Sequence, residues 1–179
     1  MAKILKSSVW IPVALAAVLF GAAAIRAPGE HRGPCVVLSG ADSTIADARC
    51  VRITTLEDWA ALWREHQGLP PRPKSENRKP YEVDLPQVDF TTHVVIGVFE
   101  GETVNSRGLT AVALESAEGR SILRYESQSY QTMEEVDHVR PYGFFVLPRT
   151  GEALDLEEQL GMPGGASRIE PRQSFPALP

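Results

Sequence analysis

Histidines are the side chains of this chain best suited to acid–base or metal chemistry, but their spacing indicates no reaction centre. The four are His31, His66, His93 and His138, and no two have the i, i+4 spacing at which helical histidines bind a metal. His138 follows Asp137, and a neighbouring carboxylate can orient an imidazole for proton transfer. Such neighbours also arise by chance, so the sequence predicts no metal site and no cofactor.

Motifs for nucleophilic catalysis and phosphate binding are also missing from the sequence. It contains no Gly-x-Ser-x-Gly elbow and no Gly-x-x-x-x-Gly-Lys loop. Acidic residues cluster at 134–137 and 152–158, without the alternating Asp spacing of a calcium loop. We interpret both clusters as solvated surface and predict that the protein is not an enzyme. An enzyme using His138 and nearby carboxylates is the alternative.

The N-terminal segment has the three parts of a secretion signal. Lys3 and Lys6 give a basic start, residues 9–25 are largely apolar, and small residues occupy 21–24. We predict a signal peptide over residues 1–24, followed by a linker over 25–33; an uncleaved N-terminal anchor is the alternative. The remainder is predicted to be exported, to the periplasm or the extracellular space.

The chain has two cysteines, Cys35 and Cys50. In an exported protein an even number of cysteines indicates a disulfide, and two cysteines permit a single intramolecular pairing. Closing a loop of this size is worth about 3 kcal/mol in loop-closure entropy. Because the spacing is not Cys-x-x-Cys, the bond is predicted to be structural rather than a redox site.

The charge composition argues against one class of partner, nucleic acids. The chain of 179 residues carries 18 Lys and Arg against 23 Asp and Glu, a net charge of −5. A nucleic-acid partner would require a basic face to neutralise phosphates, so the acidic balance argues against one. A hydrophobic fraction of 43% is sufficient for a folded core. A membrane is expected as a partner only if the N-terminal segment is not cleaved.

One amphipathic helix is predicted between Thr55 and Gly68. Thr55 can cap its N-terminus, acidic residues occupy its first turn, and Gly68 followed by prolines ends it. Its apolar residues share one face at helical spacing; they are Leu56, Trp59, Ala60, Leu62 and Trp63.

Strands are predicted over most of the remaining chain. Residues 93–99 are nearly all apolar and β-branched, as is typical of a central strand buried on both faces. Residues 109–115 and 122–130 flank a glycine turn and predict a hairpin. Further strands are predicted at 142–147 and, at a sheet edge, at 154–157. Residues 69–86 are expected to form a solvated loop, and 161–179 a disordered tail.

These elements predict a single α+β domain over residues 34–160. The fold is mainly an antiparallel β-sheet, or a sandwich, of about six or seven strands with the amphipathic helix packed against it. Packing against the helix would cover the apolar face that the sheet otherwise exposes. The choice between one sheet and a sandwich stays open.

Several short motifs follow one another in an order that resembles a known family. They are Val88-Asp89-Phe90, the strand 94–99 with Gly101-Glu102 after it, and Pro-Tyr-Gly-Phe-Phe-Val-Leu-Pro at 141–148. Over 88–159 the chain is similar to the C-terminal domain of the PrcB family, accessory subunits of secreted bacterial protease complexes. The helical segment 56–63 also resembles one that commonly precedes that domain. The family's Thr-Gly-Gly-Tyr-like turn is replaced here by residues 105–109.

The resemblance and the lack of catalytic motifs together predict an exported, non-enzymatic domain that binds another exported or membrane-associated protein. That partner would belong to a protease or envelope complex. Loops on a rigid sheet commonly carry binding, so the contact surface is predicted at loop 101–108 with 140–142. The same loops resemble those of chagasin-like cysteine-protease inhibitors, which makes inhibition the alternative function. The candidate residues are Asn105, Arg107, Gly108, Arg140, Pro141 and Tyr142.

Overall fold

A computed structural model describes residues 37–70, 85–133, 135–162 and 164–179. The predicted signal peptide, the linker, Cys35 and most of the proline-rich loop lie outside the described residues. Among those that are described, no helix is long and apolar enough to cross a membrane. The elements are β1 (Val37–Gly40), β2 (Arg49–Ile53), α1 (Leu56–His66), β3 (His93–Phe99), β4 (Thr103–Val104), β5 (Ser106–Ala117), β6 (Arg120–Ser129), β7 (His138–Val139), β8 (Tyr142–Pro148), β9 (Ala153–Gly161) and β10 (Ser167–Phe175).

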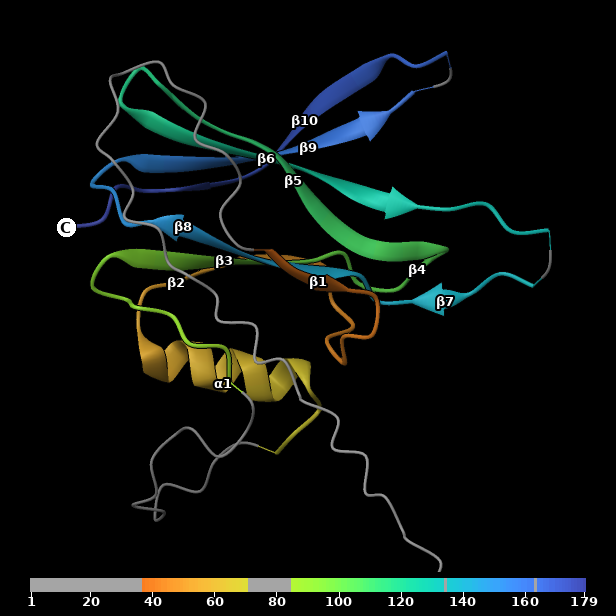
Figure 1. The fold of residues 1–179 in the computed structure, drawn as a ribbon, viewed down its shortest axis with the longest axis horizontal. Coiled ribbons are helices and arrows are strands. Elements are labelled where there is room, and N and C mark those ends of the chain that lie inside the picture. The colour runs from red at the N-terminus through yellow and green to blue at the C-terminus, as the bar shows by residue number, and fades with distance from the viewer. Residues whose placement is uncertain (1–36, 71–84, 134, 163) are drawn as a thin grey trace, which may run out of the picture.

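The described chain forms three layers (Figure 1). A middle sheet with the strand order β1-β8-β3-β2 packs between helix α1 and an outer sheet with the order β10-β9-β6-β5. A two-stranded sheet of β4 and β7 lies at one end. The predicted α+β fold is confirmed in its sandwich form, with ten strands in the described residues rather than six or seven.

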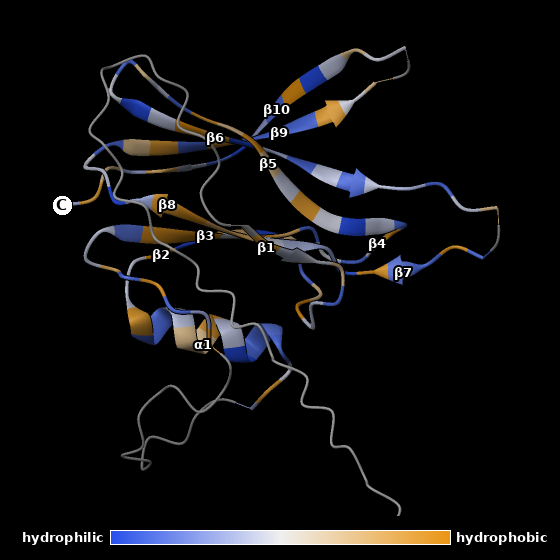
Figure 2. Cartoon of the chain, in the orientation of Figure 1, coloured by the Kyte–Doolittle hydropathy of each residue, from blue (hydrophilic) through white to orange (hydrophobic). Residues whose placement is uncertain are grey.

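Strand β3 shows why the middle sheet is so apolar. Its neighbours β8 and β2 flank it on both edges, and successive side chains point to opposite faces. Val94, Ile96 and Val98 pack against the outer sheet, whereas Val95 and Phe99 pack toward α1. Both faces are therefore covered, as the continuous apolar sequence predicted. Figure 2 shows the apolar residues concentrated in these central strands.

Helix α1 has the predicted caps and the predicted face. The Thr55 hydroxyl accepts a hydrogen bond from the Asp58 amide at 3.1 Å, and Gly68 adopts a φ of +67°, which glycine tolerates at a helix end. Trp59 is 1% exposed and meets the Phe144 ring edge-on, with ring centroids 4.9 Å apart. Its indole N–H donates to the Pro86 carbonyl at 2.9 Å, which satisfies the buried donor.

The outer sheet corrects two predictions. Strands β5 and β6 form the predicted hairpin, and β9 runs parallel to β6. Strand β9 is not an edge strand, because β10 pairs along its other side. The tail predicted to be disordered is therefore ordered over Ser167–Phe175. Its prolines and glycines have positional roles instead: Gly164 and Gly165 have positive φ in the turn, and Pro171 lies beside a β-bulge on an edge strand.

Candidate functional site

The outer sheet divides into two arms partway along β6 and β9. At the divided end, the first arm consists of β5 and β6, and the second arm consists of β9 and β10. The parallel pairing of β6 with β9 ends at Tyr125 and Glu158. Beyond that point β6 pairs only with β5, and β9 pairs only with β10. Within the described chain, Glu126–Ser129 and Gln159–Gly161 thus each have one edge with no strand beside it. Figure 1 shows the two arms spreading apart at this end.

A cleft of about 650 Å³ lies between the arms and the end of the middle sheet. We call it the open cleft. Residues from both arms line its walls, among them Ser127, Ser129 and residues 159–161. Residues 48–50 of the β2 region also line it, as do residues 98–100, 102 and 103 at and after the end of β3. Its volume falls within the range of small-ligand and peptide sites.

A buried ion pair lies where the arms separate. Leu154, Leu156 and Glu158 alternate along β9 and are all buried, so Glu158 takes a position that two leucines take earlier in the strand. Glu158 accepts a hydrogen bond from Nε of Arg172 at 2.5 Å. Arg172 is the extra residue of the β10 bulge, which redirects its side chain. Because a buried carboxylate requires a partner, the bulge is what makes Glu158 tolerable in this position.

Glu100 is a second carboxylate in the cleft, directly after β3. It is half-buried, and its Oε2 accepts a hydrogen bond from the Ser127 hydroxyl at 3.1 Å. Burial raises its pKa and the Glu158 charge raises it further, whereas the Ser127 hydrogen bond and the Arg172 charge lower it; the net shift is upward. No lysine or arginine of the described chain lies close enough to Glu100 to form an ion pair with it. Glu100 is therefore a half-buried carboxylate with no direct cation partner among the described residues, a feature that often marks functional sites.

Two other titratable side chains of the cleft, Tyr125 and Cys50, are uncharged. Burial raises the pKa of the Tyr125 phenol and of the Cys50 thiol, so both are neutral at physiological pH. Cys50 has no disulfide partner among the described residues. Its predicted partner Cys35 lies outside them, so the disulfide stays a prediction. The described residues contain no group of three His, Cys, Asp or Glu arranged to hold a metal ion.

Large apolar side chains are exposed on both arms. Seven are exposed among the described residues, and five of these lie on or beside the two arms, although none is among the residues that line the open cleft. The five are Val104, Met133 and Val136 on the side of β4 to β7, and Met162 and Ile169 on the β9–β10 arm.

Three of the predicted contact residues lie on or beside the first arm. Asn105, with a φ of 52°, joins the start of β5 to the segment before β7. Its main-chain N–H donates to the Asp137 main-chain carbonyl at 2.9 Å, and its side-chain Oδ1 accepts from the Asp137 main-chain N–H at 3.0 Å. The Arg107 guanidinium lies over the Tyr130 ring, 5.2 Å from its centroid. Arg140 lies 3.5 Å from Glu102 at the base of the arm. Pairing of β4 with β7 brings the two predicted loops together.

The other three predicted residues serve the interior. Gly108 is buried, and a Cβ there would lie 2.7 Å from the Gly40 amide nitrogen, so only glycine fits between β5 and β1. Pro141 is fully buried. Tyr142 is half-buried, with its ring centroid 4.1 Å from that of His66. These positions offer a partner little or no surface.

Sequence reasoning missed the charged residues of the cleft. Glu158 belongs to the acidic cluster at 152–158, which the sequence suggested was solvated surface; that interpretation is wrong. Within it Asp155 pairs with Arg120, and Glu157 pairs with Arg124 at 2.9 Å. The one available signal was the position of Glu100, a charged residue directly after a nearly all-apolar strand.

Comparison with known protein families, with curated proteins and with solved structures finds no match to this chain. The resemblance to the PrcB domain therefore stays a prediction.

Proposed function

We propose that this chain is a non-enzymatic protein-binding domain that holds an extended segment of its partner in the open cleft. The observation that carries the proposal is the split of the outer sheet after Tyr125 and Glu158. It leaves a strand edge on each arm, and an extended peptide can add to such an edge through main-chain hydrogen bonds. A segment seated there would restore the sheet that the two arms interrupt.

The surroundings of the cleft support the same proposal. The exposed apolar residues on or beside both arms would contact parts of the partner that extend beyond the inserted segment. The partner would be an exported or membrane-associated protein, such as a component of a protease or envelope complex, as the resemblance implies. We do not extend the proposal to protease inhibition, because Gly108, Pro141 and much of Tyr142 lie inside the fold.

The test uses short random peptides displayed on phage and selected on the full chain. Ser129 lines the cleft on the same face of β6 as Tyr125 and Ser127, whereas its neighbour Gln128 points to the opposite face, and both are exposed. Ser129→Trp therefore places an indole in the cleft, and Gln128→Trp is its matched control.

We expect selected peptides to bind the wild type and Gln128→Trp alike. Ser129→Trp should weaken binding by at least about tenfold, because its indole projects into the cleft where the inserted segment would lie. Replacing alternate peptide N–H groups by N-methyl groups should weaken binding similarly. Failure to select any peptide, or equal binding by the two tryptophan variants, would overturn the proposal.

A further inference from the structure

We propose that the segment held in the open cleft carries a lysine or arginine whose cation pairs with Glu100. This inference rests on the proposed function and adds the chemistry of the partner to it. It follows from where Glu100 lies beneath the first arm and from the charges that already have partners around it.

The position of Glu100 is set by its hydrogen bond to β6. Ser127 donates to Glu100 from the part of β6 that lies beyond the split. Side chains two residues apart share one face of a strand, so Tyr125, Ser127 and Ser129 all face the cleft, whose lining they form. A strand added to β6 there shares that face, and every second side chain of it would point toward Glu100.

Each of the other charges that line the cleft has an oppositely charged neighbour within the described chain. Glu158 is paired with Arg172. Arg49 lies 2.7 Å from Glu65 and has its guanidinium over the Phe99 ring, although its Nε and Nη2 are buried without a hydrogen bond to any described residue.

Glu102, the remaining carboxylate of the lining, pairs with Arg140 at 3.5 Å. Among the described residues, the Ser127 hydroxyl is the one side-chain donor to Glu100. A partner's ammonium or guanidinium group would supply the missing charge, whereas an acidic side chain would meet an unpaired carboxylate.

The experiment measures coupling between Glu100 and the peptide. A peptide selected on the wild type is synthesised with its inward basic residue kept, and with that residue replaced by norleucine, which keeps the apolar stem and removes the charge. Both peptides are titrated against the wild type and against Glu100→Gln. Glutamine preserves the shape and can still accept the Ser127 hydrogen bond. Glu126→Gln, on the opposite face of the same arm, is the control.

We expect the norleucine peptide to bind the wild type and Glu126→Gln about tenfold more weakly than the basic peptide, and Glu100→Gln to bind both peptides equally. Cleft-binding peptides that contain no enriched basic position, or a charge effect that persists in Glu100→Gln, would overturn this inference alone. Peptides whose binding is indifferent to Ser129→Trp would instead overturn the proposed function and this inference with it.

Discussion

The two ends of the sandwich are built from the same strands and end differently. At the closed end, where β5 turns into β6, the outer and middle sheets leave a cavity of only about 20 Å³. At the other end the same two layers enclose the open cleft of about 650 Å³. Along β9 the interior-facing residues are Leu154 and Leu156 toward the closed end and Glu158 where the arms separate. One change of residue class along one face accompanies the change from packed core to cleft.

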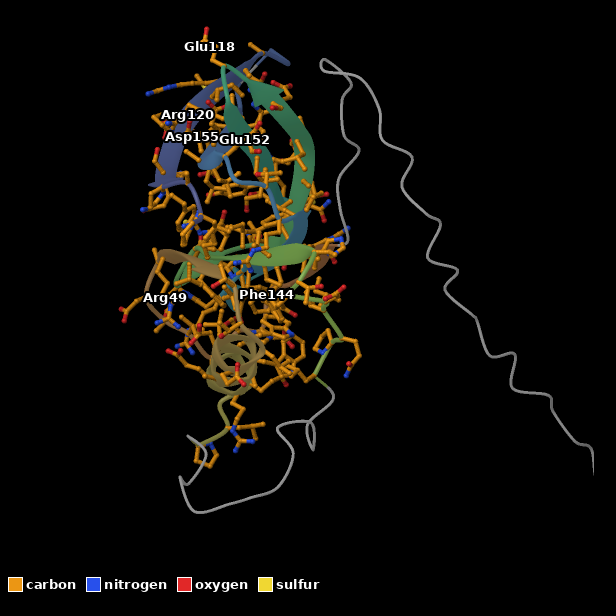
Figure 3. All side chains as sticks on the ribbon, turned by 90° about the vertical axis from the view of Figure 1, so that its left-hand side faces the viewer. Arg49, Glu118, Arg120, Phe144, Glu152 and Asp155 are labelled. Carbon is orange, nitrogen blue, oxygen red and sulfur yellow. The ribbon has the colours of Figure 1, made fainter. Side chains whose placement is uncertain are left out.

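Charges are handled differently at the two ends as well. Figure 3 shows Arg120, Glu152 and Asp155 gathered beside the hairpin turn at the closed end. Arg120 donates to Asp155 from two nitrogens, and Ser174 donates to the same carboxylate at 2.6 Å. These charges lie on the rim, where water can reach them. At the open end Glu100 and Glu158 lie under the arms instead. The comparison teaches that the layers are packed where the inward positions are apolar, and that the cleft lies where the inward positions carry carboxylates.

Removing a leucine from the closed end should have the largest effect on stability. Leu156 is 1% exposed in the core between the sheets. Leu156→Ala should lower the free energy of unfolding by about 3 kcal/mol, because it removes buried apolar surface and leaves a cavity. The measurement is urea denaturation, with Val112→Ala on the exposed side of β5 as the control, expected within about 0.5 kcal/mol of wild type. A loss below about 1 kcal/mol would contradict the view that this end is tightly packed.

Breaking the buried ion pair should have the next largest effect. Arg172→Ala leaves the Glu158 carboxylate buried without its cation, and we expect a loss of about 2 kcal/mol. Adding Glu158→Gln to Arg172→Ala should recover most of that loss. Arg168→Ala, which removes an exposed arginine paired with Glu170 on the same strand, should cost less than about 0.5 kcal/mol. Similar losses for Arg168 and Arg172 would show that Glu158 is not held in a dry site.

Acid titration should affect the closed end through Asp155. The hydrogen bonds from Arg120 and Ser174 lower the pKa of Asp155 to about 2. A lowered folded-state pKa stabilises the fold above the ordinary carboxyl pKa near 3.8 and loses that contribution as the pH falls toward 2. Asp155→Asn should therefore be less stable than wild type at pH 7, with the difference shrinking toward pH 2. Thermal unfolding across that range checks it, and a constant difference would argue against the pairing.

The smallest effect should have the opposite sign, at Glu100. Burial raises the pKa of Glu100, so its contribution favours the fold below the ordinary carboxyl pKa and is lost as the pH rises through the folded-state value. Glu100→Gln removes this penalty and should slightly raise the free energy of unfolding at pH 7, with no gain at pH 3. If Glu100→Gln instead lowered the free energy of unfolding at pH 7, the Glu100 carboxylate would have a cation partner in the folded protein.

The sequence predicted correctly those elements whose pattern of apolar residues shows which of their faces are buried. The capped, amphipathic segment at 56–66 and the apolar run at 93–99 both form as expected, because their periodicity reports which faces are covered. The ordered strand β10 was missed, because its proline and glycines suggested disorder when read without its partner β9. The parallel pairing of β6 with β9 joins residues far apart in the chain and has no local signature.

The candidate site depends on such distant pairings, so most of it could not be predicted. Arg172 meets Glu158 because a bulge shifts one strand against another, and neither residue's sequence neighbours suggest it. The open cleft exists because β6 and β9 stop pairing after Tyr125 and Glu158. The sequence nevertheless identified loop 101–108 and residues 140–142 as neighbouring segments at this end, and β4 and β7 join them as a pair.

Amide hydrogen exchange with and without a selected peptide tests the central claim most directly. If an extended segment adds to the arms, exchange should slow at cleft-facing amides of residues 126–129 and 159–161, whose edges have no strand partner among the described residues. Residues 120–125 and 153–158, already paired with each other, should be unchanged. Protection at the exposed surface of α1 or at the closed end, with none in the arms, would contradict the account.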